Sequence, residues 1–159
     1  MWRRAWVDGV DQFQSRWWDS YRISQNIGTG LISQGTADWD DYAVSAVVTV
    51  MLARQAGIAA RVGGMRRWYA LLLCDDGMVR LVKDREAVDT LAEAPFAWSL
   101  DTRYTLALTV TGNRLVGTVD GVEVLQATDQ HEPLLGGGIG LVVSDGTLGA
   151  AAVSVTPAR

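Results

Sequence analysis

The chain has 159 residues and a formal net charge of −4, from 14 basic and 18 acidic side chains. This length suits one domain with its own hydrophobic core, so we expect a single domain over residues 1–159. The acidic balance and the scattered basic residues argue against nucleic acid as a partner, because a nucleic-acid binder carries a basic stripe.

Membrane and metal chemistry are also disfavoured. No stretch approaches the roughly 18 apolar residues of a membrane span, and the N-terminus lacks the apolar region of a signal peptide. We therefore expect no membrane partner, and the cellular location stays open. The single cysteine, Cys74, follows three leucines, which favours a buried, unreactive thiol. The single histidine, His131, excludes a His-rich metal centre and is typical of a loop.

The first part of the chain has a less regular strand pattern than the rest. Over residues 1–35 we expect an irregular segment that completes the fold, with one strand in 12–23 and another in 27–33. Residues 42–50 contain enough Ala and Val to suggest a helix, but the β-branched residues, with Val44, Val48 and Val50 on one parity, favour a strand.

Four further strands follow at short intervals, over residues 56–62, 68–74, 78–85 and 88–94. Glycine and aspartate turns separate them, and Pro95 ends the last. In the first of these strands the alternation predicts that Ile58, Ala60 and Val62 point inward, whereas Ala59 and Arg61 point outward.

Residues 104–129 carry the strongest local signal. Leu106, Leu108 and Val110 alternate with alanine and threonine residues up to a turn at Gly112-Asn113. The next strand ends at Asp120-Gly121, and such a pair between apolar runs predicts a type I′ hairpin turn. Three strands and two hairpins are expected here. The outward parity consists of Ala107, Thr109, Thr111, Thr118 and Asp120.

The last part of the chain predicts two strands, over residues 139–143 and 151–155, separated by a turn at Asp145-Gly146. Strands that recur every 8–12 residues with turns between them are typical of a sandwich or barrel. The predicted fold class is all-β, a two-sheet antiparallel β-sandwich.

Aromatic residues are the first candidates for a binding site. Seven tryptophans is a high count for this length, and tryptophan rings can stack on sugars or fill a core. Adjacent strand residues point to opposite faces, so one member of the Trp68-Tyr69 pair can reach the outer face. Trp39 and Trp98 are candidates at the rim.

A second candidate is the polar face of the central strands. Small outward residues beside Arg61, Tyr69 and Arg80 would form a shallow groove suited to sugar hydroxyls, with Thr109 and Asp120 on its floor. The alternative is a solvated sheet face that binds nothing, because every antiparallel sandwich shows such alternation.

Carboxylates give the third candidate. A glycosidase needs two of them about 5–10 Å apart. The acidic residues of this chain lie mostly at turns, where aspartate accepts from backbone amides. We therefore expect no catalytic residues and no enzymatic activity. A small glycoside hydrolase, with Glu86 or Asp120 as its carboxylates, stays an alternative.

Several segments together resemble the concanavalin A-like lectin/glucanase jelly roll in its laminin G-like bacterial form. They are DYAVSAVVTV, AGIAARVGGMRRWYALLL, YTLALTVTGNRLVGTVDGVEVL, GGGIGLVVSDG and AAVSV. In addition, ISQNIGTGLISQGTADWDDY over residues 23–42 is similar to the start of an accessory domain in bacterial ADP-ribosylglycohydrolase-like proteins. This second resemblance implies a module that accompanies a catalytic domain.

The resemblance also bears on metal. Many relatives carry paired aspartates before the final strand, often for structural calcium, whereas this chain has only Leu, Gly and Ala over residues 148–152. We therefore expect no cofactor, and a structural calcium there is disfavoured.

The sequence thus predicts a non-catalytic, lectin-like module that binds glycan on a concave sheet or at rim loops. The expected contacts are Arg61, Trp68, Tyr69, Arg80, Thr109 and Asp120, with Trp39 and Trp98 at the rim. The main alternative is a structural domain that packs on a partner enzyme domain or self-associates through Trp2, Trp6 and Trp17.

Overall fold

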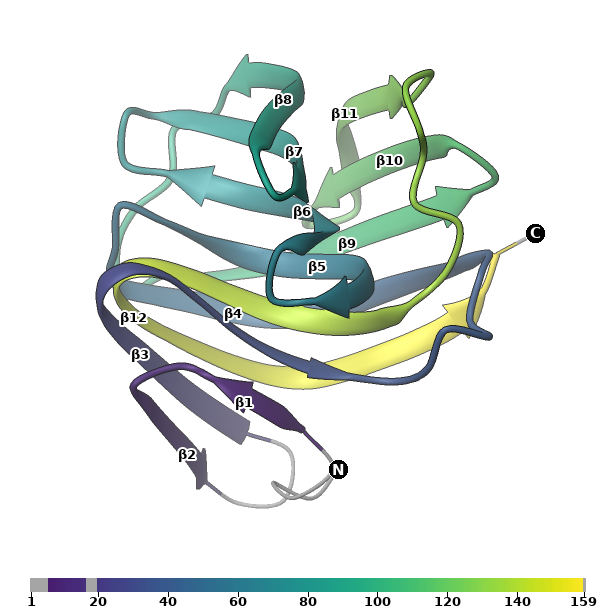
Figure 1. Cartoon of the computed structure of the whole chain (residues 1–159). Helices are drawn as coiled ribbons and strands as arrows, with labels where there is room; N and C mark the ends of the chain where they lie inside the picture. Colours follow the sequence, from purple (N-terminus) through teal and green to yellow (C-terminus); the bar gives the residue numbers. More distant parts are fainter. Residues whose placement is uncertain (1–5, 17–19, 159) are drawn as a thin grey trace.

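The computed structural model describes residues 6–16 and 20–158 and shows an all-β, antiparallel fold (Figure 1). Its strands, in chain order, are β1 (Val7–Gly9), β2 (Gln12–Arg16), β3 (Ser20–Gln34), β4 (Tyr42–Leu52), β5 (Gln55–Gly64), β6 (Arg67–Cys74), β7 (Met78–Arg85), β8 (Val88–Pro95), β9 (Arg103–Thr111), β10 (Arg114–Val119), β11 (Val122–Thr128) and β12 (Gly138–Pro157). The predicted fold class is confirmed.

Two strands, β3 and β12, run through both layers of the sandwich. The first half of β12 pairs with β5 and its second half with β4, while β3 follows it along the other side. Hydrogen bonds therefore connect the strands in the order β11-β10-β9-β4-β12-β5-β6-β7-β8. We call the layer of β4, β9, β10, β11 and the second half of β12 sheet one. The layer of β5 to β8 and the first half of β12 is sheet two.

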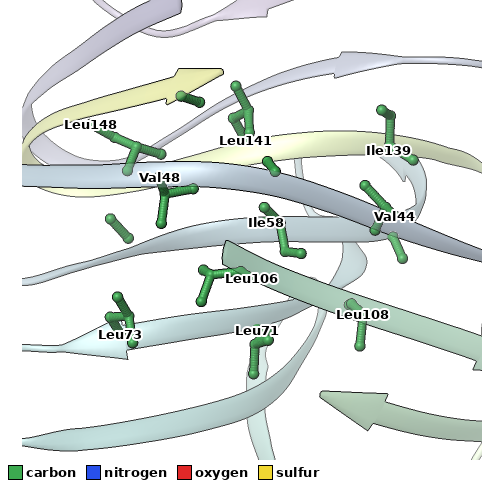
Figure 2. Close-up of a cluster of buried hydrophobic side chains, with 14 of the residues drawn as sticks. Val44, Val48, Ile58, Leu71, Leu73, Leu106, Leu108, Ile139, Leu141 and Leu148 are labelled. Atoms are coloured by element: carbon green, nitrogen blue, oxygen red, sulfur yellow. The ribbon is translucent and has the colours of Figure 1, made fainter. Parts of the chain in front are cut away.

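The core lies between the two sheets and follows the predicted parities (Figure 2). Val44 and Val48 of β4 and Leu106 and Leu108 of β9 face Ile58, Leu71 and Leu73 of sheet two, and all are at most 1% exposed. Each buried leucine or valine contributes about 1.5–3 kcal/mol relative to an exposed one. This alternation therefore fixes which face of each strand turns inward.

The hairpins of the 104–129 segment form as predicted. Asp120 and Gly121 have φ angles of 51° and 81°, as a type I′ turn requires. Leu115 and Val119 are buried, whereas Thr109 and Thr118 lie on the outer face of sheet one.

One expectation about the strands was wrong, and two others are corrected in their bounds. The Asp145-Gly146 pair is a bulge inside β12 and not a turn, because β12 continues along β3 with only a register shift. The predicted strand at residues 12–23 divides into β2 and the start of β3. The predicted strand at 27–33 is the continuation of β3 past Gly28, whose φ is 79°.

A register shift also reverses the parity at the end of β5. Arg61 has a φ of 51°, and the pairing of β5 with β6 slips between Ala60 and Gly64. Val62 therefore joins a second apolar cluster on the outer face of sheet two, with Leu72 and Trp68. The predictions that Val62 points inward and Arg61 outward were therefore both wrong, and this one bulge is the reason.

Candidate functional site

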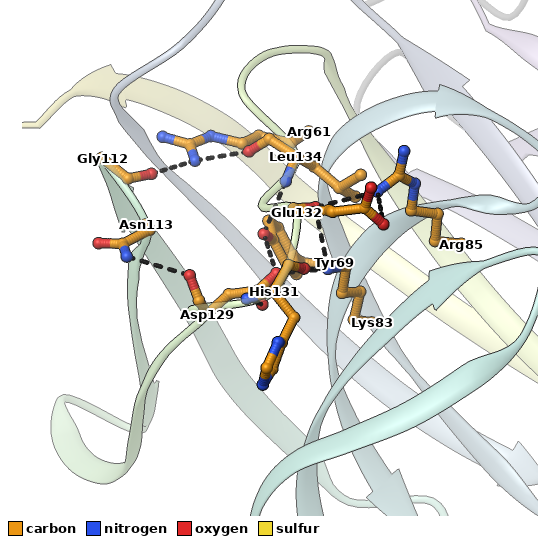
Figure 3. Close-up of polar contacts among 10 residues, drawn as sticks. All are labelled: Arg61, Tyr69, Lys83, Arg85, Gly112, Asn113, Asp129, His131, Glu132 and Leu134. Carbon is orange, nitrogen blue, oxygen red and sulfur yellow. Dashed lines mark hydrogen bonds and ion pairs between the residues drawn. The ribbon is translucent and has the colours of Figure 1, made fainter.

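A buried polar network lies at one end of the sandwich (Figure 3). Lys83, at the end of β7, and Asp129, just after β11, form an ion pair of 2.7 Å while only 5% and 3% exposed. The hydroxyl of the buried Tyr69 donates to Asp129 over 2.7 Å. Charges as well paired as these can be buried, because each retains strong hydrogen bonds.

This network holds the loop between β11 and β12. Asp129 accepts from the amide of His131 over 3.1 Å, and the ammonium of Lys83 donates to the carbonyls of His131 and Glu132. The amide of Leu134 donates to the Tyr69 hydroxyl over 2.9 Å. The loop is thus fixed by side chains that rise from sheet two. His131 is the loop residue that the sequence predicted, and it contributes backbone groups to the network.

Burial alone raises the pKa of Asp129, but hydrogen bonds from Lys83, Tyr69 and the His131 amide outweigh it and hold that pKa below its usual range. The pKa of Tyr69 is raised, first by burial and then by its bond to Asp129. At neutral pH Asp129 is therefore a carboxylate and Tyr69 a neutral phenol.

Arg61 ties the neighbouring segments to the same end. It is 2% exposed, and its guanidinium donates to the carbonyls of Asp40, Gly112 and Leu134 and to the carboxylate of Asp41. A guanidinium presents five donors in a rigid fork. Arg61 therefore fixes the β9–β10 turn, the start of β4 and the 129–137 loop relative to one another.

A polar hollow of about 570 Å³ opens beside this loop, and we call it the rim hollow. Its lining consists of Arg66, Arg67, Arg85, Glu86 and Glu132. It combines three planar donor groups with two carboxylates. Such a set can hydrogen-bond to neighbouring hydroxyls of one ligand from both sides, as donor and as acceptor.

Buried or paired groups position the lining. Arg66 pairs over 2.9 Å with Asp84, whose side chain is 4% exposed, and also donates to the carbonyl of Glu86. Arg85 pairs with Glu132 over 2.9 Å. Arg67 has no side-chain partner among the described residues. Among the described residues that line the rim hollow, Arg67 is thus the only arginine whose guanidinium bonds to no other protein group.

Two residues of the rim hollow have left-handed backbones although neither is glycine. Glu86 has a φ of 63° and Glu132 a φ of 49°. Such conformations cost about 1–3 kcal/mol each and collect at functional sites, where the surrounding structure holds them. Here the holding groups are Arg66 and Lys83, which bind the carbonyls of these same two residues.

The structure does not bring the sequence-predicted contacts together. Arg61 and Tyr69 are enclosed at the end of the sandwich, and Trp68 is 2% exposed within the outer cluster of sheet two. Arg80, on that same outer face, is paired with Asp76 and Glu93. The expected groove from Arg61 and Tyr69 to Thr109 does not form, because Thr109 lies on the outer face of sheet one.

Asp120 and the rim tryptophans are spread over both ends. Asp120 accepts from the Thr105 amide over 2.8 Å at the end opposite the rim hollow. Trp98 is partly buried and donates to the carbonyl of Cys74 over 2.8 Å. Trp39 lies at the same end of the sandwich as the rim hollow, in a separate depression of about 220 Å³, with its ring edge-on to Tyr42.

The sequence also predicted properties of Cys74, of three tryptophans and of two carboxylates. Cys74 is buried and free, and burial raises its pKa. Trp6 is 6% exposed and packs edge-on against Tyr21, so it belongs to the core and not to an exposed association surface. Trp2 and Trp17 lie outside the described residues. Glu86 and Asp120 stand at opposite ends of the sandwich and do not form a carboxylate pair.

Sequence reasoning missed Arg66, Arg67, Arg85 and Glu132. The Arg66-Arg67 pair after Gly63-Gly64 was a visible signal, since it marks an exposed hairpin tip with two cations. Arg85 and Glu132 are far apart in the chain and gave no local signal.

In the described part of the chain, no group of three or more His, Cys, Asp or Glu could hold a metal ion, and no helix is long and apolar enough to cross a membrane.

No protein-family model matches the sequence, and no curated protein matches it. Solved structures do match its fold. The carbohydrate-binding module CBM66 from Bacillus subtilis has a TM-score of 0.84 at 18% identity, over 95% of this chain and 94% of that one. A Bacillus subtilis protein of unknown function with a galectin-like fold has a TM-score of 0.74 at 14% identity, over 97% and 90% of the two chains.

A more distant match is sheep galectin-11 in complex with glycerol, with a TM-score of 0.55 at 14% identity, over 82% of this chain and 98% of that one. At such identities the likeness defines the architecture alone. The chain thus has the galectin-like, concanavalin A-like jelly-roll fold.

Proposed function

We propose that this chain is a non-catalytic module that binds carbohydrate in the rim hollow. The observation that carries the proposal is the polar lining of the hollow, held in place by buried charges. Buried ion pairs seldom add net stability compared with apolar residues. The Lys83–Asp129 pair is therefore better explained as a device that positions the loop bearing Glu132.

The chemistry of the hollow suits a sugar. Vicinal hydroxyls offer both donors and acceptors, and the hollow supplies guanidinium donors beside carboxylate acceptors. Arg85 and Glu132 already form a pair, so a hydroxyl can bridge them without any rearrangement of the loop. The structural similarity to a carbohydrate-binding module and to a galectin supports this class of ligand.

The test is a glycan array, followed by calorimetry on the glycans that bind and on soluble β-glucans, xylans and galactans. Arg67→Gln and Glu132→Gln each remove one charged group from the hollow and should weaken binding about tenfold or more, since a charge-assisted hydrogen bond contributes about 1.5–3 kcal/mol. Arg114→Gln is the matched control, because Arg114 is exposed and bonds to Gln126 away from the hollow. Unchanged affinity in the hollow variants would reject this site.

Glu86→Gly adds a variant whose folding is protected. Glycine adopts the left-handed φ of residue 86 without a Cβ clash, so this variant should be at least about as stable as the parent. It should nevertheless bind glycan more weakly, because a carboxylate is lost. If no glycan in the array binds the parent chain at all, the carbohydrate proposal fails as a whole.

The finer resemblance to laminin G-like domains and to the accessory domain of ADP-ribosylglycohydrolase-like proteins leads to a second proposal, that the module accompanies a catalytic domain. The test is a fusion of the chain to such an enzyme domain. Mutation of the rim hollow should leave the turnover of small substrates by the fused enzyme unchanged. The same mutation should abolish binding of the fusion protein to immobilised glycan. Light scattering distinguishes this proposal from the alternative of self-association, because self-association requires a stable dimer in the absence of sugar.

A further inference from the structure

A second feature, distant from the rim hollow, lies on the outer face where β3, β12, β4 and β9 run side by side. Their registers place Arg22 opposite Gly149, Gly149 opposite Thr49, and Thr49 opposite Arg103. These four residues form one row across the strands. With strands about 4.8 Å apart, the Cα atoms of the two arginines are roughly 14 Å apart.

The middle of this row is hollowed. A groove of about 380 Å³ follows β12, and its floor is made by Gly149, Ala151 and Ala152. No side chain rises from Gly149, and a Cβ there would meet only the terminal methyl of Met51 within 3.4 Å. The arginines thus stand on either side of a trough with little relief, which we call the face groove.

The charge of the face groove is not balanced by the protein. None of the described residues that line it is acidic, and neither arginine has an ion-pair partner among the described residues. The Nε atom of Arg22 is buried without a hydrogen-bond partner. Buried donors are normally paired, but this atom has almost no accessible surface, so an anion in the groove would pair with the terminal guanidinium nitrogens of Arg22.

The type of anionic ligand follows from the backbone. All four strands pair with their neighbours here, so the groove offers no free main-chain groups for an extended peptide to pair with. The available groups are two guanidinium groups and the hydroxyls of Ser20 and Thr49. Two cations are also too few for a nucleic-acid backbone, for which a basic stripe is expected.

We propose that the face groove binds an acidic oligosaccharide, whose carboxylate or sulfate groups pair with Arg22 and Arg103 while its rings lie over Gly149 and Ala151. This site is independent of the rim hollow, which lies at the end of the sandwich and holds its own carboxylates. The chain would then have two saccharide sites of different chemistry, one on an end and one on a face.

Calorimetry at low salt with tetragalacturonate, its methyl ester and a heparin tetrasaccharide tests the proposal. We expect at least one of the two anionic probes to bind, and the neutral methyl ester to bind at least tenfold more weakly. Arg22→Gln and Arg103→Gln should each reduce the affinity about tenfold, and raising the salt concentration should weaken binding, because the contacts are ionic. Arg114→Gln, which removes an exposed arginine outside the groove, should have no effect.

Gly149→Val tests the groove itself, because it places a branched side chain on the floor of the groove. Residue 149 lies in a strand, and strands tolerate β-branched residues. It should abolish binding of the anionic probe while circular dichroism and thermal unfolding show a folded protein. Glu132→Gln, in the rim hollow, should leave this binding unchanged, so failure of one site is distinguishable from failure of the other. Equal binding of the methyl ester or of an oligoglutamate peptide, no binding of either anionic saccharide, or no effect of the two arginine variants would overturn the proposal.

Discussion

At the scale of single residues, the buried charges of this protein hold segments in place. Lys83 and Asp129 are each other's partners beneath the 129–137 loop, and Arg61 joins this loop to two further segments at the same end. Removing such groups from water costs several kcal/mol per ion, which their attraction roughly offsets. Their contribution is therefore chiefly the position of the loop that carries Glu132.

Replacement of Lys83 by methionine should be strongly destabilising. The substitution leaves the Asp129 carboxylate buried with only neutral donors, and breaking a buried ion pair in this way costs about 3–5 kcal/mol. Urea unfolding should show the loss as a lower midpoint. The double variant Lys83→Met, Asp129→Leu should regain part of that loss. A single variant as stable as the parent would contradict this account of the pair.

Asp129 should also give the protein a defined acid sensitivity. Its folded pKa lies below the usual value, so its stabilisation is fully present above the unfolded pKa of about 4. The stabilisation is lost as the pH falls from there through the folded pKa. Urea midpoints between pH 7 and pH 2 should decline more steeply for the parent than for Asp129→Asn. Asp75→Asn, at an exposed turn, should retain the parental slope.

At the scale of elements, β5 shows how closely the strands approach one another. An alanine Cβ at Gly57 would come within 1.9 Å of the Leu71 carbonyl oxygen on β6, whereas nothing lies within 4 Å of the same position at Gly64. The first position tolerates only glycine. The second is open.

Gly57→Ala and Gly64→Ala therefore form a matched pair in one strand. The clash at residue 57 is with backbone and should cost about 1–3 kcal/mol or more. Gly64→Ala should change the unfolding free energy by less than about 1 kcal/mol, and can be slightly stabilising through the unfolded state. Chemical denaturation of both variants measures the difference. Equal stabilities would show that β6 moves away freely.

The strands from β4 to β11 were predictable because each is a local pattern that ends at a turn. Met78–Arg85, for example, has the predicted bounds. The bulges were not predictable in this way, since Asp145-Gly146 has the composition of a hairpin turn and only the long partner β3 keeps the strand continuous. The candidate site was mostly missed, because Arg85 and Glu132 meet through tertiary packing around Lys83 and leave no pattern in the sequence.

At the scale of the whole molecule, β3 and β12 connect the two sheets into one hydrogen-bonded unit. Ser20 lies opposite Ala151 and Gln34 opposite Ile139, so almost the whole length of β3 is paired with a segment distant in sequence. Loss of this pairing separates both sheets at once. Unfolding should therefore be a single cooperative transition.

Hydrogen exchange provides the measurement. The amides of β12 should exchange only through global unfolding, while those of the edge strands β8 and β11, each paired on one side along the sheet, should exchange through local opening. Near-ultraviolet and far-ultraviolet signals should give the same midpoint in denaturant. Two separate transitions, one for each sheet, would contradict the connection through β12.

The place of β12 in the chain also affects how the protein is made in the cell. Synthesis proceeds at about 5–20 residues per second, and β4 and β5 have emerged from the ribosome long before the strand that separates them, residues 138–157, has been translated. Until then both carry unpaired edges and exposed valines and isoleucines. We therefore expect the nascent chain to need holding chaperones through most of its synthesis, and slower translation should increase aggregation.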